Sequence, residues 1–446
     1  MKKLLTTLMV AALAAVSSGC GGKAVTGSPW TRWGISQPTA ETGAEARLAD
    51  AHRLLYELRF DTAQARYQAL VASLPQSAEA HLGLSIACRY AGSRDMAFSE
   101  AGAAFALDSA AAAVLLNYGN LLMPMRTGPV TDLSDSARYA ESERLLLKAA
   151  ASHHPFNAHA HIELWAGYMG QGRLSDARHQ AFELSQKHYY PKPLLDFAHN
   201  LLVGLAPSAI LFTNGDNDTY PPWALQNAGK PFRPDVTVAN LTLLNLPAVV
   251  KMMRDSFGLP VSLSDAEIDS LAPRPGPIGM EPPAQQVVAD VVAGSARAGR
   301  PVYFAVTVRS EVAEKYRDRL VLEGLVNRFT EGKPAAPVDA ERIEENLEKN
   351  YRLGWPDTLP PWPQNMSPLT RRYAPLALNY ANLYLQVAVR NDTLGRIEDA
   401  AAARREAVVW LLRGGKKDDA RVLVGELLQR SPDDPAAKKL QARLNR

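Results

Sequence analysis

The chain has 446 residues, of which 47% are hydrophobic and 21% are charged, an ordinary composition for a globular protein of several domains. The 49 basic and 46 acidic residues leave a net charge of +3. This balance argues against charge-driven binding to nucleic acid or to an anionic membrane surface.

The first residues carry the features of a bacterial export signal. Met1, Lys2 and Lys3 provide a positive start, and residues 4–16 form an apolar run that is too short to span a bilayer as a mature helix. The following Ser-Ser-Gly-Cys, which ends at Cys20, resembles the cleavage box of bacterial lipoproteins. We therefore predict a signal peptide over residues 1–19 and lipidation of Cys20, including palmitate. An ordinary cleaved signal peptide is the alternative.

This resemblance also implies a location. A lipidated Cys20 would anchor the mature chain in the cell envelope, and Gly21 after it favours the outer membrane, with the protein facing the periplasm. Residues 20–43 are rich in Gly, Ser, Thr and Pro and lack apolar periodicity, so we expect a flexible tether. No later stretch of the sequence is long and apolar enough for another membrane span.

A repeating helical pattern begins at residue 44. Its marker is an alanine that follows a glycine by five residues, as in Gly92 with Ala97 and Gly172 with Ala177. The glycine fits a tight turn between two helices, and the small alanine lets the helices approach closely. Ala63 precedes Ala97 by 34 residues. The pattern resembles the tetratricopeptide repeat (TPR), a helix–turn–helix unit of that length, and we predict such repeats over residues 44–204.

The same marker returns near the C-terminus. Gly415 with Ala420 reproduces it, and Gly395 with Ala400 gives a weaker copy. Residues 366–446 are therefore predicted to form further TPR-like helices. Three or more stacked repeats are enough for a stable solenoid.

Between the repeat regions, residues 205–332 are predicted to form a small α/β module, and residues 333–365 a linker. Short apolar runs alternate with helical patterns in this module, which favours a parallel, Rossmann-like sheet of about four strands. The predicted fold class is a TPR-like α-helical solenoid that flanks this module, mostly α overall. The strand candidates are Ile210–Thr213, 236–240, 301–308 and 320–329.

The polar loop after the first strand candidate contains the candidate ligand-binding residues. Asp216 and Asp218 are two residues apart, so in an extended segment both carboxylates would point the same way and could hold a divalent cation. With Asn217 between them they also match the Asp-x-Asp pattern of glycosyltransferases. Thr219 and Trp223 complete the set, because an indole can stack on a sugar. The alternative is a purely structural loop, since Gly, Asp, Asn and Thr also make turns and helix caps.

This block carries a second resemblance. The sequence Thr-Asn-Gly-Asp-Asn-Asp-Thr-Tyr-Pro-Pro-Trp, followed by Arg-Pro-Asp-Val and Asn-Leu-Thr-Leu-Leu-Asn, is similar to a segment of the soluble C-terminal region of the protein O-mannosyltransferase-like multi-pass membrane family. The resemblance covers roughly residues 205–330. The corresponding residues are Gly215 to Pro221, Trp223, Gln226, Arg233, Asp235, Val236, Asn240, Leu241, Leu243, Leu244 and Asn245.

The resemblance implies the module and not the family's reaction. That family is associated with a polyprenyl-phosphate-linked sugar donor and an acidic catalytic residue among transmembrane helices, which this sequence lacks. Pro222 also replaces the usual leucine. The implied role is accessory, in recognition or assembly, with carbohydrate as a possible ligand.

A histidine-rich stretch, residues 153–163, raises the question of a metal site. Zinc needs ligands that converge, and on a helix these should be three or four residues apart. His159 and His161 are two apart and should diverge. His81 occupies the same repeat position as His161, so we expect repeat packing to explain both, and we predict no metal and no cofactor.

Three functions remain open from the sequence. The leading hypothesis is a lipid-anchored, extracytoplasmic scaffold that binds a protein partner in the cell envelope and is not an enzyme. The second is a sugar- or metal-binding accessory of envelope glycosylation that acts through the Asp216–Thr219 loop. The third, an enzyme that uses Asp216 and Asp218 with a metal, lacks a complete catalytic set.

Overall fold

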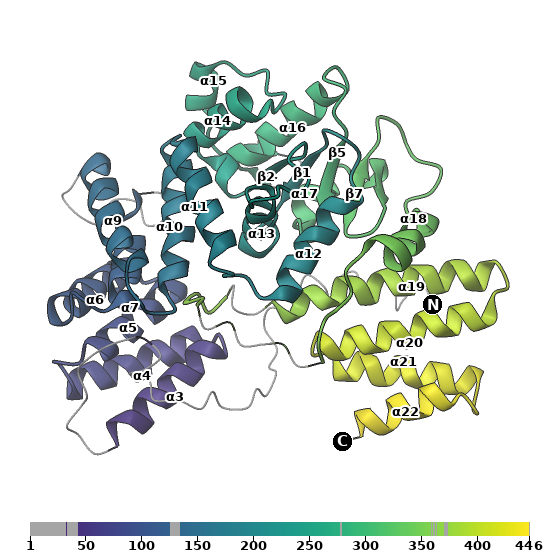
Figure 1. Ribbon diagram of the computed structural model, residues 1–446, viewed down its shortest axis with the longest axis horizontal. Helices are drawn as coiled ribbons and strands as arrows, with labels where there is room; N and C mark the ends of the chain where they lie inside the picture. The colour runs from purple at the N-terminus through teal and green to yellow at the C-terminus, as the bar shows by residue number, and fades with distance from the viewer. Residues whose placement is uncertain are drawn as a thin grey trace. The chain divides into compact units, whose positions relative to one another are not determined.

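The structure is a computed structural model that describes residues 33, 43–124, 134–276, 279–357, 359, 362, 364–369 and 373–445 (Figure 1). The predicted signal peptide and Cys20 lie outside these residues. The chain divides into two compact units. We call the one that ends at Tyr189 and also takes in residues 361–371 the repeat unit. The other, which comprises Tyr190–Pro360 and Arg372–Arg446, is the sheet unit.

Four antiparallel helix pairs build the described part of the repeat unit. Each helix packs against the next along the chain, as expected for stacked helix–turn–helix repeats. The pairs are α3 (Ala44–Tyr56) with α4 (Phe60–Ser73), α5 (Ala78–Ala91) with α6 (Arg94–Leu107), α7 (Ala112–Leu122) with α9 (Asp135–Ala150), and α10 (Asn157–Gly170) with α11 (Leu174–Gln186).

The glycine–alanine marker has the predicted structural role. Gly92 and Gly172 turn the chain within their pairs at φ values of 90° and 71°, a region that favours glycine. The alanines that follow by five residues, Ala97 and Ala177, are buried between helices. In the first pair the equivalent turn position is occupied by Leu58, which takes the same left-handed conformation at φ 62°. The repeat prediction is therefore confirmed in its physical detail.

The sheet unit contains a five-stranded sheet in the order β2-β1-β5-β7-β6. Strand β1 pairs in parallel with β2 and β5, whereas β7 pairs antiparallel with β5 and β6. The strands are β1 (Ile210–Thr213), β2 (Thr237–Asn240), β5 (Val302–Ala305), β6 (Leu320–Leu322) and β7 (Val326–Phe329).

The prediction of a parallel sheet of about four strands is therefore partly wrong. The fourth strand candidate, residues 320–329, is two strands joined by a tight turn. The turn includes Gly324, whose φ of 132° is poorly accessible to other residues. Because a short turn reverses the chain, β6 and β7 form a hairpin and the sheet becomes mixed.

Helices and one short hairpin surround the sheet (Figure 1). The chain enters through α12 and, after β1, runs through α13 to β2 and then through further helices to β5. These elements are α12 (Lys192–Val203), α13 (Asp216–Gln226), η1 (Leu243–Asn245), α14 (Pro247–Phe257), α15 (Asp265–Asp269), the hairpin strands β3 (Arg274–Gly276) and β4 (Gly279–Glu281), α16 (Pro283–Ser295), α17 (Ser310–Glu314) and η2 (Arg317–Arg319).

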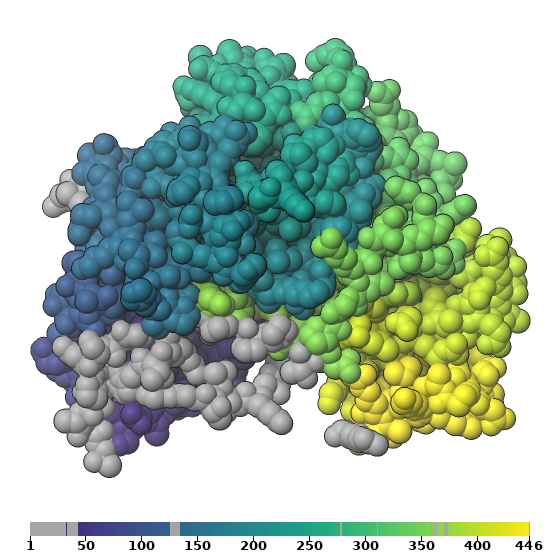
Figure 2. Space-filling view, in the orientation of Figure 1, coloured from purple at the N-terminus to yellow at the C-terminus, as the bar shows by residue number. Residues whose placement is uncertain are grey.

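Helices complete the sheet unit after β7. Gly395 and Gly415 have φ values of 72° and 78° at the turns, and Ala400 and Ala420 are fully buried, so the C-terminal repeat marker behaves like the N-terminal one. The last helices, in yellow, form one continuous surface in Figure 2. The elements are α18 (Ala340–Glu345), η3 (Asn346–Asn350), η4 (Ala374–Leu376), α19 (Ala377–Thr393), α20 (Ile397–Arg413), α21 (Lys417–Arg430) and α22 (Pro435–Leu444).

None of the helices in the described part of the chain combines the length and apolar content that a bilayer crossing requires.

Candidate functional site

The topology of the sheet marks one edge as the natural place for a ligand. The chain leaves β1 towards β2 on one side, and leaves β5 towards β6 on the other. In open α/β sheets, ligands bind where neighbouring strands diverge in this way, outside their carboxyl ends. The loop after β1 holds the candidate residues from Asp216 to Thr219, and the loop after β5 holds Thr307.

The two carboxylates of the loop do not converge. Helix α13 begins at Asp216, so the segment is helical and not extended. Residues two apart on an α-helix point about 200° apart around its axis. Asp216 is exposed, whereas Asp218 is only 3% exposed. The expectation that both side chains point the same way is therefore wrong, because α13 already begins at Asp216.

The Asp218 carboxylate is used inside the chain, at the start of α13. Oδ1 accepts a hydrogen bond of 2.8 Å from the Gly215 amide, and Oδ2 accepts one of 2.8 Å from the Asn214 amide. The Thr307 hydroxyl donates to Oδ2 from the neighbouring strand end. Burial raises the pKa of this carboxyl, and the hydrogen bonds oppose that shift. The amides and the positive end of the α13 dipole, which could bind an anion, are thus satisfied from within the chain.

Thr219 ties the same loop to the middle of the sheet. Its hydroxyl lies 2.6 Å from that of Thr213 at the end of β1 and accepts a 2.8 Å hydrogen bond from the Asn240 side chain at the end of β2. The Asn240 amide oxygen in turn accepts from the Leu243 backbone at 2.9 Å. Thr213, Thr219 and Asn240 contribute polar side chains that are buried, and Leu243 contributes its backbone amide. The network therefore holds the two strand ends and α13 together.

Trp223 is an internal residue of the module. Its side chain is 7% exposed, its ring packs edge-on against Tyr220 with centroids 5.6 Å apart, and its indole N–H donates to the Val238 carbonyl at 3.2 Å. A tryptophan that stacks on a sugar needs an open ring face. The burial of Trp223 favours a core role.

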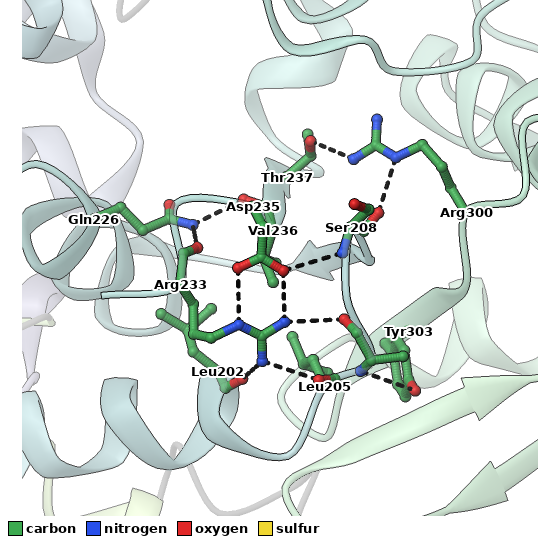
Figure 3. Close-up of polar contacts among 11 residues, drawn as sticks. Leu202, Leu205, Ser208, Gln226, Arg233, Asp235, Val236, Thr237, Arg300 and Tyr303 are labelled. Atoms are coloured by element: carbon green, nitrogen blue, oxygen red, sulfur yellow. Dashed lines mark hydrogen bonds and ion pairs between the residues drawn. The ribbon is translucent and has the colours of Figure 1, made fainter. Parts of the chain in front are cut away.

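Arg233 and Asp235 form a staple that sequence reasoning missed (Figure 3). The Arg233 guanidinium holds both carboxylate oxygens of Asp235, at 2.9 and 2.8 Å. It also donates to the carbonyls of Leu202, Leu205 and Ala206 at 2.8–2.9 Å, where α12 ends. A cation suits the carbonyl end of a helix. The Arg-x-Asp pattern thus serves to attach α12 to the sheet.

Arg300 makes a second attachment at the start of β5. Its side chain donates to the Ser208 carbonyl at 2.9 Å and to the Thr237 hydroxyl at 2.6 Å (Figure 3). It also donates to the Phe257 and Gly258 carbonyls. These bonds join the entrances of β1, β2 and β5. Burial lowers the pKa of this guanidinium, which nevertheless stays charged in proteins. Arg300 is therefore occupied by the fold.

The sheet unit also contains a hollow of about 630 Å³. It lies beside the end of α16, and apolar side chains such as Val292, Val302 and Phe329 line it. Arg300 and Lys315 contribute positive charge, but Arg300 is saturated as described and Lys315 pairs with Glu281 at 2.7 Å. Arg319 and Glu331 also line the hollow, so it combines apolar surface with charged side chains.

The histidines of the repeat unit take part in packing contacts. His81 lies 2.6 Å from Glu100 and His161 lies 2.7 Å from Gln180, both 19 residues further along the chain. The equal spacing shows that the two histidines hold equivalent positions in their pairs. In the part of the chain that the structure describes, no group of three or more His, Cys, Asp or Glu side chains could hold a metal ion.

Comparison with known proteins adds a local match. A family model described as TMEM260-associated domain 2 matches residues 194–270, which span α12 to α15. No curated protein matches the chain. The matched stretch contains both the Asp218 hydrogen-bond set and the Arg233 staple.

A search of solved structures finds distant likenesses. PilF of Pseudomonas aeruginosa is 18% identical over 48% of this chain and 83% of its own, at a TM-score of 0.31. PilW, a type IV pilus biogenesis factor, is 17% identical over 51% and 97%, also at 0.31. The TPR domain of P58(IPK) is 12% identical over 90% and 88%, at 0.24. Likenesses with such low scores carry no argument about this chain.

Proposed function

We propose that this chain is a lipid-anchored, extracytoplasmic scaffold that binds a protein partner through its helical repeats and does not catalyse a reaction. The observation that carries the proposal is the internal use of the Asp218 carboxylate. Asp218 accepts hydrogen bonds from two backbone amides and from the Thr307 hydroxyl, so its carboxylate serves the fold at the carboxyl ends of β1 and β5. Recognition is then left to the helix pairs.

The distribution of exposed apolar side chains supports this view. Most of the large hydrophobic residues that are at least about a third exposed lie on the helix pairs. Within the described α/β module, Met280 is the only large hydrophobic residue with that exposure. Exposed apolar groups on stacked repeats are common points of protein contact. On the repeat pairs they are Tyr56, Met96, Leu147, Phe182, Leu394, Ile397 and Val422.

Site-specific photo-crosslinking in the native envelope tests the scaffold role. A photoreactive residue at Phe182 or Ile397 should give discrete protein adducts. The same residue at Lys230 or Arg297, which are exposed in the α/β module, should give none. If the repeat positions yield no protein adduct while the controls are equally well expressed, the scaffold proposal fails.

The anchoring part of the proposal is supported by the sequence from Met1 to Cys20. Cys20→Ser should abolish incorporation of labelled palmitate and release the protein from the membrane fraction. Because the helix pairs begin only at residue 44, the circular dichroism of the variant should not change. Retention of the variant in the membrane fraction would contradict a lipid anchor.

Sugar or cation binding by the Asp216–Thr219 loop stays a prediction. Its support is the resemblance of this block to the O-mannosyltransferase-like family. Calorimetry with mannosides and with Mg²⁺ or Ca²⁺ should show heat that is reduced in Asp216→Asn if the loop binds either. Asp216 suits this test better than Asp218, because loss of Asp218 would disturb the fold as well.

A further inference from the structure

The hollow beside the end of α16 contains groups that the fold does not use. It lies within the sheet unit and measures about 630 Å³, a size typical of cavities that bind a small organic ligand. Its lining residues are of three kinds, aromatic, aliphatic and charged. Each kind limits what the hollow could bind.

The aromatic part of the lining is held in place by its neighbours. The Tyr316 ring stacks on Phe304 with centroids 5.5 Å apart and meets the Phe329 ring edge-on at 5.7 Å. Tyr316 is 8% exposed and Phe304 is fully buried. Burial raises the pKa of the Tyr316 hydroxyl to about 12, so this part of the lining stays uncharged at neutral pH. Rings fixed in this way offer an apolar ligand a preorganised surface.

The aliphatic part of the lining comes from α16 and β5. Val292 lies in the last turn of α16, Ala296 follows the helix, and Val302 begins β5. Val302 is buried, Val292 is half-buried and Ala296 is exposed. Because the lining includes both buried and exposed residues, a ligand could bury an apolar body there and keep a polar head near water.

Arg319 is a charged lining residue with unused donors. Its Nε donates to the Thr330 carbonyl at 2.9 Å, and its guanidinium carbon lies 4.3 Å from the centre of the Phe329 ring. Among the residues that the structure describes, this side chain has no other hydrogen bond and no ion pair. Its two terminal nitrogens therefore remain available, and a guanidinium can bind both oxygens of a carboxylate.

The other charged lining residues differ in how far the fold neutralises them. Lys315 pairs with Glu281 at 2.7 Å. Arg300 binds carbonyls and one hydroxyl, so its charge has no carboxylate partner within the described residues. Glu331 is exposed and forms no ion pair in the described part of the chain. Arg300 and Arg319 against Glu331 leave the unpaired charge of the lining positive, which favours an anionic ligand.

We propose that the hollow binds an amphiphile with a single carboxylate, of the class of medium-chain fatty acids. The apolar chain would lie along Tyr316, Phe329 and Val302. The carboxylate would accept hydrogen bonds from the terminal nitrogens of Arg319. This site goes beyond the proposed scaffold function and does not depend on it.

Isothermal titration calorimetry of the full-length chain with octanoate tests the proposal. Arg319→Gln should weaken binding about tenfold, because a charge-assisted pair of hydrogen bonds is lost. Arg317→Gln is the matched control. It removes the same charge two residues earlier in η2, from a side chain that is 72% exposed and does not line the hollow, and it should bind like the wild type.

Glu331→Gln should act in the opposite direction. Loss of this negative charge should tighten octanoate binding about threefold, and added salt should reduce the difference from the wild type. Because Glu331 is exposed and unpaired within the described residues, the variant should fold normally. It therefore tests the proposal even if Arg319→Gln is unstable.

Related ligands and a blocking variant separate the head group from the apolar chain. Octanol, which has no charge, and octylamine, which has the opposite charge, should each bind at least about tenfold more weakly than octanoate. Ala296→Phe introduces a ring into the lining from an exposed position and should abolish the heat of octanoate binding.

Absence of octanoate binding by the wild type, or equal affinity for octanoate and octanol, would overturn the inference. Equal affinity of Arg319→Gln and the wild type would do the same, provided that urea denaturation of the variant stays cooperative. None of these results touches the scaffold proposal, which depends on the crosslinks at Phe182 and Ile397.

Discussion

At the scale of single residues, buried polar groups decide what the module can do. Asp218 and Arg233 belong to the most distinctive part of the sequence, yet the charged group of each forms hydrogen bonds with backbone groups of the same chain. Removing one partner of such a set leaves the others buried without partners, which costs more than the bond itself. Substitution of either residue should therefore lower the free energy of unfolding.

Asp218→Ala should lower the free energy of unfolding by about 2–3 kcal/mol. The variant loses the cap of α13 and leaves the Asn214 and Gly215 amides without their acceptor. Asp216→Ala, at an exposed position in the first turn of the same helix, should cost about 0.5 kcal/mol. Urea denaturation of the two variants measures the difference, and equal costs would contradict the assigned cap.

Acid should weaken the Arg233 staple. The Arg233 guanidinium lowers the pKa of Asp235 to about 2, below its ordinary value near 4. The stabilisation is therefore present above pH 4 and is lost as the pH falls from about 4 to 2. The Asp235 side chain is 38% exposed, so screening reduces the contribution to about 1 kcal/mol. In denaturation at several pH values, Asp235→Asn should flatten this part of the stability profile.

At the scale of elements, the turns of the repeats show how local rules build the helix pairs. The same turn position is glycine in the second pair and leucine in the first, at φ values of 90° and 62°. Left-handed backbone costs a non-glycine residue about 1 kcal/mol. The first pair therefore carries a strain that the second does not.

Exchanging the residues at these turns should have opposite effects. Leu58→Gly should raise the free energy of unfolding by up to about 1 kcal/mol, because the strain is relieved. Gly92→Ala should lower it by about 1 kcal/mol, although a Cβ there would meet no atom within 4 Å. Chemical denaturation gives both signs, and a stabilising Gly92→Ala would refute the role of backbone conformation.

The hairpin of β6 and β7 depends on Gly324. A Cβ at this position would lie 2.2 Å from the Tyr351 hydroxyl, which accepts a hydrogen bond from the Leu325 amide at 2.9 Å. Gly324→Ala should therefore cost about 3 kcal/mol, from the clash together with the unfavourable φ. Thermal denaturation measures this cost, and the variant should unfold at a lower temperature or lose its cooperative transition. A melting temperature within a degree of the wild type would contradict it.

The elements that could be predicted from the sequence are those that depend on residues close together in the chain. The spacing of Gly92 and Ala97 and the apolar run of β1 act within one turn or one strand, and both predictions agree with the structure. The contact of Asp218 with Thr307 joins residues 89 apart, and no local spacing announces it. Arg233 and Asp235 are part of the family-like block of the sequence. Their role could not be predicted, because Arg233 binds backbone carbonyls at the end of α12, and every residue has such a carbonyl.

At the scale of the whole molecule, the two units share one chain that passes between them more than once. Trp355 and Trp362 lie seven residues apart yet belong to different units. Trp355 donates its indole N–H to the Pro193 carbonyl and packs near Tyr380 and Trp410 in the sheet unit. Trp362 contacts Tyr189 in the repeat unit.

Truncating each tryptophan should disturb one unit at a time. Trp362→Ala should cost about 3 kcal/mol and speed hydrogen exchange in α10 and α11, while Trp355→Ala should act on α19 and α20. Hydrogen exchange read by mass spectrometry on proteolytic fragments separates the two patterns. If both variants accelerate exchange in the same helices, the division into units does not describe how the protein unfolds.

The discontinuous make-up of the repeat unit has a consequence for biosynthesis. The first stretch of the repeat unit ends at Tyr189, but its last piece, residues 361–371, emerges about 180 residues later. At a synthesis rate of 5–20 residues per second, the nascent helices lack their contacts with residues 361–371 for on the order of 10 to 40 s. During that interval Tyr189 lacks its contact with Trp362, so holding factors that shield aromatic surface would find their substrate in the unfinished polypeptide.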